Sequence, residues 1–259
     1  MKNDDALDKV QALIKSIGFQ GSRTNGKREI ASCGPVVTIA RDFGAGGNAA
    51  GRILAGKIGV PCLDQELLDQ IVERMKTDKK LMRRFDERLP QSFLEDWLYT
   101  MVTKGAPNRS VYHQRLIHLI QGVADMGGVI LGRGAHLILD NRKNVFRMRI
   151  TGSVEVCAKR IADREGVDLE KAKRMITQIN QERMAFVRGL FKHFPSTKTY
   201  YDLVLNSDGL TPDQITEVAL FTMKQMGFHV PERKTDNGRH LPSAKDSGIK
   251  HGQSAYQAA

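Results

Sequence analysis

The chain has 259 residues, of which 41% are hydrophobic and 27% charged, a composition typical of globular rather than disordered proteins. With 40 basic and 29 acidic residues its formal net charge is +11, which favours anionic partners such as nucleotides. Only 6% of the residues are aromatic, which disfavours a base-stacking nucleic-acid module, and no apolar run is long enough for a membrane helix.

The chain can be divided into three parts. Apolar residues at helical spacing from Leu7 to Ile17 predict a short helix, and a linker follows at residues 21–28. We therefore expect residues 1–33 to form an appendage, either docked on the main domain or binding a partner. Residues 34–228 are predicted to form that domain. Residues 229–259 are rich in glycine, serine, proline and charge without periodicity, and we expect them to be disordered.

Within the main domain, apolar and β-branched runs alternate with amphipathic ones. The apolar runs predict strands at residues 36–40, 60–63, 129–131, 145–150 and 201–206. The amphipathic patterns predict helices at residues 49–58, 64–75, 93–101, 116–124, 154–165, 169–192 and 212–226. Strands that alternate with helices favour an α/β fold with a parallel sheet.

The three cysteines, Cys33, Cys62 and Cys157, form neither a disulfide framework nor a metal-ligand pattern. The start of the sequence also lacks the apolar stretch of a secretion signal. We therefore expect a protein of the reducing cytoplasm, and we assign no side chain as a metal ligand.

The strongest local signal is a glycine-rich segment between the first strand and the next helix. It contains Gly44, Ala45, Gly46, Gly47 and Asn48. Glycines let backbone N–H groups approach a phosphate closely, and the start of a helix adds the positive end of its dipole. A tight strand-to-helix turn without a ligand is the alternative. The segment is not a GxxxxGK[ST] match, because neither Lys nor Ser/Thr occupies its distal end.

Several segments, in chain order, resemble the cytidylate kinase-like family of P-loop nucleoside monophosphate kinases. The resemblance is carried by residues 41–55, 60–68, 129–135, 160–166, 182–183 and 201–206. It covers residues 34–227 and implies a three-layer P-loop nucleoside kinase-like core with a parallel sheet, a helical insert and a mobile arginine lid. It also implies phosphoryl transfer from ATP to a pyrimidine monophosphate such as CMP, with Mg²⁺.

The resemblance also implies roles for individual residues. The glycine-rich residues 44–48 would wrap the donor phosphates, and Asp64 and Arg133 would face the acceptor nucleotide. The three lid arginines, Arg160, Arg164 and Arg183, would neutralise charge on the transferring group. Arginine suits this role because it stays charged and binds phosphate oxygens in a bidentate fork.

Several of these residues have a second interpretation. Asp64 equally suits a helix cap. The lid residues Arg160 and Arg164 are four apart, which also fits one solvated helix face, and Arg183 could pair with its neighbour Glu182. Arg133 lies between glycines directly after an apolar strand, where loops of α/β folds bind ligands.

The glycine-rich segment departs from that of ordinary monophosphate kinases. In those kinases a lysine of the loop contacts the donor phosphates. A gapless alignment places Gly47 of this chain at the position of that lysine. The next two residues are Asn48 and Ala49, so no loop Ser/Thr ligates Mg²⁺; many family members carry a basic residue where this chain has Asn48. Arg41, at the end of the first strand, could replace the lysine. The alternative function is a catalytically degraded, nucleotide-binding regulatory module, and the acceptor and the oligomeric state stay open.

Overall fold

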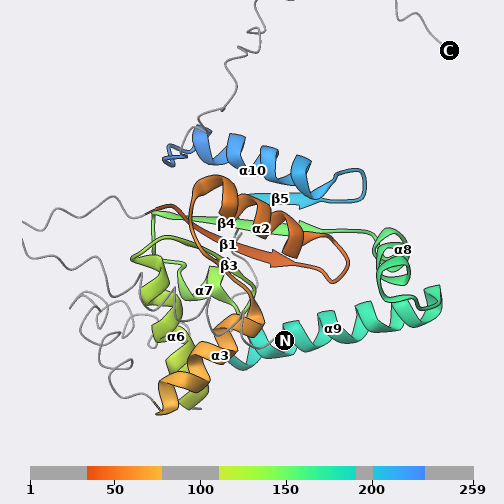
Figure 1. The fold of residues 1–259 in the computed structure, drawn as a ribbon, viewed down its shortest axis with the longest axis horizontal. Helices are drawn as coiled ribbons and strands as arrows, with labels where there is room; N and C mark the ends of the chain where they lie inside the picture. Colours follow the sequence, from red (N-terminus) through yellow and green to blue (C-terminus); the bar gives the residue numbers. More distant parts are fainter. Residues whose placement is uncertain (1–33, 78–110, 191–200, 231–259) are drawn as a thin grey trace, which may run out of the picture.

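The computed structural model describes residues 34–77, 111–190 and 201–230 (Figure 1). The predicted N-terminal helix and linker, the predicted helix at residues 93–101 and the predicted tail from residue 231 lie outside the described residues.

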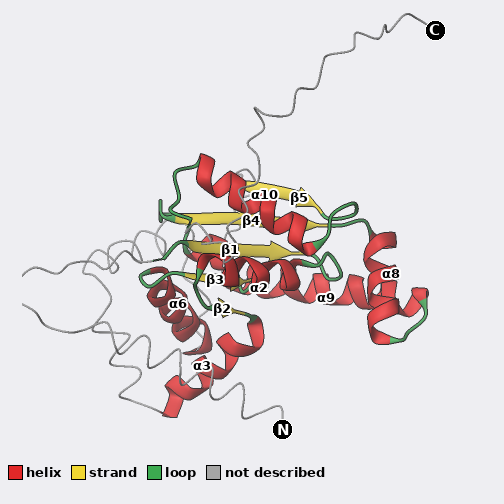
Figure 2. Ribbon diagram, turned by 45° about the horizontal axis from the view of Figure 1, so that its top comes forward, coloured by secondary structure: helices red, strands yellow, loops and turns green. Residues whose placement is uncertain are grey.

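At the centre is a parallel sheet, which confirms the predicted α/β class (Figures 1 and 2). Its strands are β1 (Val36–Arg41), β2 (Cys62–Leu63), β3 (Gly128–Leu131), β4 (Val145–Thr151) and β5 (Leu203–Asn206), in the order β2-β3-β1-β4-β5. Central β1 pairs with β3 on one side and with β4 on the other. The loops that follow these three strands therefore meet at one edge of the sheet, which is where α/β folds bind ligands.

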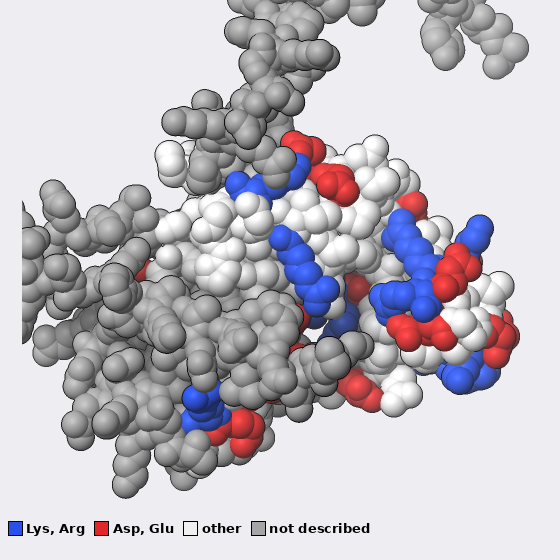
Figure 3. All heavy atoms as spheres, in the orientation of Figure 1, with Lys and Arg blue, Asp and Glu red and all other residues white. Residues whose placement is uncertain are grey.

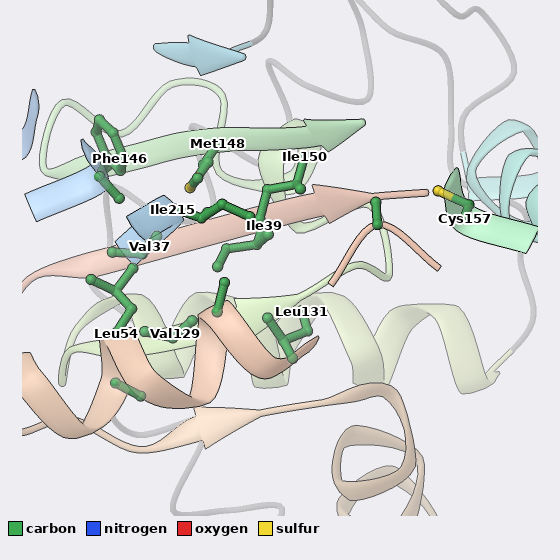
Figure 4. Close-up of a cluster of buried hydrophobic side chains, with 14 of the residues drawn as sticks. Val37, Ile39, Leu54, Val129, Leu131, Phe146, Met148, Ile150, Cys157 and Ile215 are labelled. Carbon is green, nitrogen blue, oxygen red and sulfur yellow. The ribbon is translucent and has the colours of Figure 1, made fainter. Parts of the chain in front are cut away.

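Helices cover both faces of the sheet and make a three-layer fold. They are α2 (Gly47–Ile58), α3 (Gln65–Thr77), α6 (Val111–Ala124), α7 (Ala135–Ile138), α8 (Val154–Glu165), α9 (Leu169–Leu190) and α10 (Pro212–Gln225). Alternate residues of β1 point to opposite faces, as a strand requires. Val37 and Ile39 pack in a cluster with α2, α8 and α10 (Figure 4), whereas Val36 packs in the cluster formed with α3, α6 and α7.

The ends of the helices explain where the loops turn. Gly46 and Gly59 flank α2 in the left-handed conformation, which favours glycine. Thr211 and Gln214 form a capping box at the start of α10, and Pro212 occupies the first turn. Ser153 caps α8 by accepting a hydrogen bond from the Val156 amide. These local signals fix the helix starts next to the sheet edge.

Some element bounds differ from the sequence prediction. Strand β2 is shorter than expected because Pro61, which has no N–H, can contribute only its carbonyl, which accepts from the Val129 amide. Strand β5 begins at Leu203, and Tyr201 instead stacks on His136 of α7. The four-residue helix α7 was not predicted, because all its residues are buried and it has no amphipathic pattern.

Candidate functional site

The glycine loop, residues 41–48, connects β1 to α2 at the edge of the sheet where the loops after β1, β3 and β4 meet. Gly44 and Gly46 have φ of 87° and 75°, and a Cβ at Gly44 would lie 2.8 Å from that of Cys157. The Ala50 amide donates to the Gly46 carbonyl at 3.1 Å, so the amides that precede it have no acceptor within the helix. Such amides, together with the helix dipole, can hold a phosphate.

Arg41 lies at the end of β1 and crosses the glycine loop. Its Nε donates to Oδ1 of Asn48 at 2.8 Å. Burial and the nearby charge of Arg183 lower the pKa of Arg41 to about 10, so the guanidinium is still protonated at neutral pH. The loop therefore carries a cation although it has no lysine.

Helix α9 contacts the same loop with two polar side chains. Arg183 donates from Nη1 to the Arg41 carbonyl at 3.0 Å, and its guanidinium lies 5.7 Å from the centre of the Phe43 ring. Asn180, one turn earlier, accepts from the Phe43 amide at 2.9 Å. Burial lowers the pKa of Arg183, and the charge of Asp42 partly offsets this. The structure thus brings Arg41 and Arg183 together at the glycine loop.

Beside these two arginines is an open cavity of about 800 Å³, a volume within the range of small-molecule sites. The lining residues from the loop, α2 and α9 are Arg41, Asn48, Arg52 and Arg183. Asp64 and residues of α3 complete the lining, namely Gln65, Glu66, Asp69, Gln70, Glu73 and Arg74. The cavity is therefore basic toward the glycine loop and has carboxylates and amides along α3.

Asp64 both caps α3 and lines the cavity. One oxygen accepts from the Leu67 amide at 3.1 Å, which confirms the predicted cap of α3. The other pairs with Arg52 at 3.2 Å. Asp64 also lines the cavity, so the cap does not remove it from the site.

Arg133 is held between three helices rather than lining the cavity itself. Its side chain is 13% exposed, pairs with Asp69 of α3 and lies 4.4 Å from the centre of the Phe186 ring on α9. Tyr112 of α6 donates to the same Asp69 carboxylate, and burial together with this hydrogen bond raises the pKa of Tyr112. Arg133 has a φ of 52°, unusual for a residue with a Cβ. Its link to the cavity is Asp69.

The other two arginines of the predicted lid lie on α8, where Arg164 contacts the same Phe43 ring as Arg183 and Arg160 binds the loop after β5. Arg160 donates to the hydroxyl of Ser207 at 3.1 Å and to its carbonyl at 2.7 Å, and so holds the loop after β5. Arg164 pairs with Glu165 at 2.8 Å, and its guanidinium lies 5.5 Å from the centre of the Phe43 ring. Figure 3 shows basic and acidic side chains intermixed over α8 and α9, so much of the charge there is neutralised locally.

Sequence reasoning did not single out Asn180, Phe43, Asp69 or Phe186. Asn180 could have been found, because it precedes Arg183 by three residues and therefore shares its helix face. The contacts of Asp69 and Phe186 with Arg133 join residues far apart in sequence, and no local pattern announces them.

The described residues offer no group of three or more His, Cys, Asp and Glu side chains arranged to hold a metal. Directly after the glycine loop, Ala49 has a methyl group at the position where a hydroxyl would be needed to bind magnesium. The loop therefore supplies no side-chain ligand for a magnesium ion. Within the described ranges, no helix combines the length and apolar character needed to span a membrane.

Residues 36–209 match the sequence pattern of the cytidylate kinase-like family, which covers the glycine loop, the cavity and α9. The chain belongs to this family. Family membership and the α/β fold together support a kinase-like, nucleotide-binding function.

Two curated proteins and one solved structure are similar to this family member. A cytidylate kinase of Methanopyrus kandleri is 31% identical over 100 residues, which are 35% of this chain and 52% of that protein. A uronate isomerase of Corynebacterium glutamicum is 24% identical over 142 residues, which are 54% of this chain and 26% of that protein. The chain thus spans between about a quarter and about half the length of these curated relatives.

The solved structure is that of an uncharacterized protein from Eubacterium ventriosum. It superposes with a TM-score of 0.56 at 24% identity, over 74% of this chain and 98% of that chain. This likeness shows a shared fold.

Proposed function

We propose that the chain is a nucleoside monophosphate kinase-like phosphotransferase that moves a phosphoryl group from ATP to a pyrimidine monophosphate such as CMP. The observation that carries the proposal is the convergence of Arg41 and Arg183 where the glycine loop meets the cavity. Family membership and the similarity to a cytidylate kinase support the choice of reaction.

On the donor side, the residues present suit a polyphosphate. The amides at the start of α2 supply hydrogen-bond donors, and the two guanidiniums supply positive charge beside them. Phosphoryl transfer needs mainly positioning and charge stabilisation, so this chain's own residues would bind and orient the donor phosphates and exclude water from them. Because the loop offers no side-chain ligand for magnesium, Mg²⁺ would enter bound to the ATP phosphates.

On the acceptor side, α3 offers the groups that a nucleotide base and ribose require. The carboxamides of Gln65 and Gln70 can each donate and accept, and Arg52 can meet the monophosphate. Arg133 would act through Asp69, whose carboxylate it holds at the cavity wall.

The alternative is a nucleotide-binding regulatory module that has lost catalysis. It is favoured by the sequence Gly47-Asn48-Ala49, which lacks both the loop lysine and the hydroxyl of ordinary kinases. Backbone amides and two arginines suffice for binding, whereas turnover depends on each charge that the transferring group meets. An arginine at that group contributes about 10³–10⁵-fold to related reactions.

The test is a coupled ADP-release assay with ATP and Mg²⁺ against CMP, UMP, dCMP, AMP and GMP, alongside calorimetry for ATP and CMP. We expect pyrimidine-dependent ADP release that Arg183→Met abolishes. Arg174→Met is the matched control, because Arg174 is an exposed arginine of α9 outside the cavity lining. Binding of ATP and CMP without turnover would favour the regulatory module. Absence of both binding and turnover would contradict both functions.

A further inference from the structure

Compared with the usual phosphate-binding pattern, the glycine loop has its basic residue at the first end and a glycine at the last end. That pattern is Gly, four residues, then Gly-Lys. Aligned on Gly46, it puts Arg41 at the position of the first glycine and Gly47 at the position of the lysine. A cation thus occurs where the pattern has glycine, and glycine where it has the cation.

The geometry explains why the two changes occur together. A Cβ built on Gly47 would lie 2.7 Å from Cβ and 2.9 Å from Cγ of Arg41, which is closer than real side-chain atoms approach. The backbone itself would accept a side chain, because Gly47 is the first residue of α2 and its φ is not positive. The next neighbour, Ile150, is at an ordinary 3.5 Å. Arg41 is therefore what excludes a lysine from position 47.

The far end of Arg41 is fitted just as closely. A Cβ on Gly132, in the loop after β3, would overlap with Nη1 of Arg41. Among the described residues, the Arg41 side chain makes one hydrogen bond, from Nε to Asn48. The stem of the arginine thus packs against Gly47 and its guanidinium against Gly132, and the residue lines the cavity.

We infer that Arg41 is the phosphate-binding cation of this loop and takes over the role of the missing lysine from the opposite side. The inference rests on the proposed function, and its ligand class is the phosphate tail of a nucleoside triphosphate. The charge enters from the end of β1 instead of from the start of α2, so the two arrangements are mutually exclusive. Arg183 adds a second positive charge beside it, which strengthens the attraction for an anion.

The test is a four-protein cycle on the full chain: wild type, Arg41→Gly, Gly47→Lys and the double variant. The measured quantity is the ATP dissociation constant by calorimetry, without an acceptor. Arg41→Gly should weaken binding by about 10- to 150-fold, the usual effect of losing a charged hydrogen bond. Gly47→Lys alone should also weaken binding, because its side chain needs the space of Arg41. The double variant should bind ATP more tightly than either single variant.

Arg41→Met separates charge from packing, because methionine keeps Cβ and Cγ beside Gly47. It should weaken ATP binding about as much as Arg41→Gly, while Arg174→Met, an exposed change on α9, should leave it unchanged. Thermal unfolding identifies any variant that fails to fold, and Arg41→Met then decides in place of Arg41→Gly. Wild-type affinity in Arg41→Met, or a folded double variant no better than the single variants, would overturn the inference.

These outcomes are distinct from failure of the proposed function. A wild-type chain that binds ATP and depends on Arg41, yet releases no ADP with any monophosphate, contradicts the kinase reaction alone. A wild-type chain that binds no ATP contradicts both.

Discussion

Replacing Asn180 should loosen the glycine loop without unfolding the protein. Its Oδ1 accepts from the partly buried Phe43 amide at 2.9 Å, a contact between residues 137 positions apart. In Asn180→Ala the amide loses this acceptor. A neutral hydrogen bond contributes about 0.5–1.5 kcal/mol net. Local opening of the loop should therefore become about 2- to 13-fold more frequent, since about 1.4 kcal/mol corresponds to a tenfold change.

Hydrogen exchange measured on a peptide that covers residues 41–48 reports this opening directly. The matched control is Gln178→Ala, which removes an exposed carboxamide of the same helix that donates to Glu182 rather than to the glycine loop. We expect faster exchange at Phe43 in Asn180→Ala and wild-type exchange in Gln178→Ala. Equal exchange at Phe43 in the wild type and in both variants would refute the tie between α9 and the loop.

Four further changes test other parts of the structure. Gly44→Ala should lower the free energy of unfolding by about 2–5 kcal/mol in urea titrations, because it forces a positive φ and meets the backbone of Cys157; an unchanged midpoint would contradict this. Thr211→Ala removes the cap of α10 and should cost about 0.5–2 kcal/mol in the same measurement, whereas Thr222→Ala, within the same helix, should cost less. Burial and the charge of Asp64 raise the pKa of the Cys62 thiol from 9.0 to about 11. Alkylation of Cys62 at pH 8, followed by peptide mass spectrometry, should therefore be about 100-fold slower than that of an ordinary thiol. The rate should increase as the pH rises toward 11. Arg133→Ala releases the Asp69 carboxylate that lines the cavity, and calorimetry should therefore show weaker CMP binding and nearly unchanged ATP binding; equal losses would argue against an acceptor role.

The sheet and the glycine loop could be predicted because their signals are local. Residues 36–39 are β-branched and mostly apolar because they are buried in the middle of a parallel sheet. Glycines at positions 44 and 46 have the left-handed φ that the strand-to-helix turn requires. In both cases the structural requirement is met by residues that are neighbours in the sequence.

The partners within the site could not be predicted, because they come from distant elements. Nothing near Arg160 in sequence indicates that it holds the loop at Ser207, and nothing near Arg133 indicates Asp69. The sequence does show that Gly47 has lost a lysine. Only the structure shows that the stem of Arg41 occupies the space beside it.

Helix α9 contacts both halves of the site as one rigid body. Asn180 and Arg183 contact the glycine loop, and Phe186, about 9 Å beyond Asn180 along the axis, covers Arg133. A helix does not bend easily over two turns. A tilt of α9 that breaks the hydrogen bond of the Phe43 amide therefore also shifts the Phe186 ring above Arg133. Under the proposed function, a ligand at the glycine loop would therefore shift the position of Phe186, and the two nucleotides would bind with reciprocal coupling.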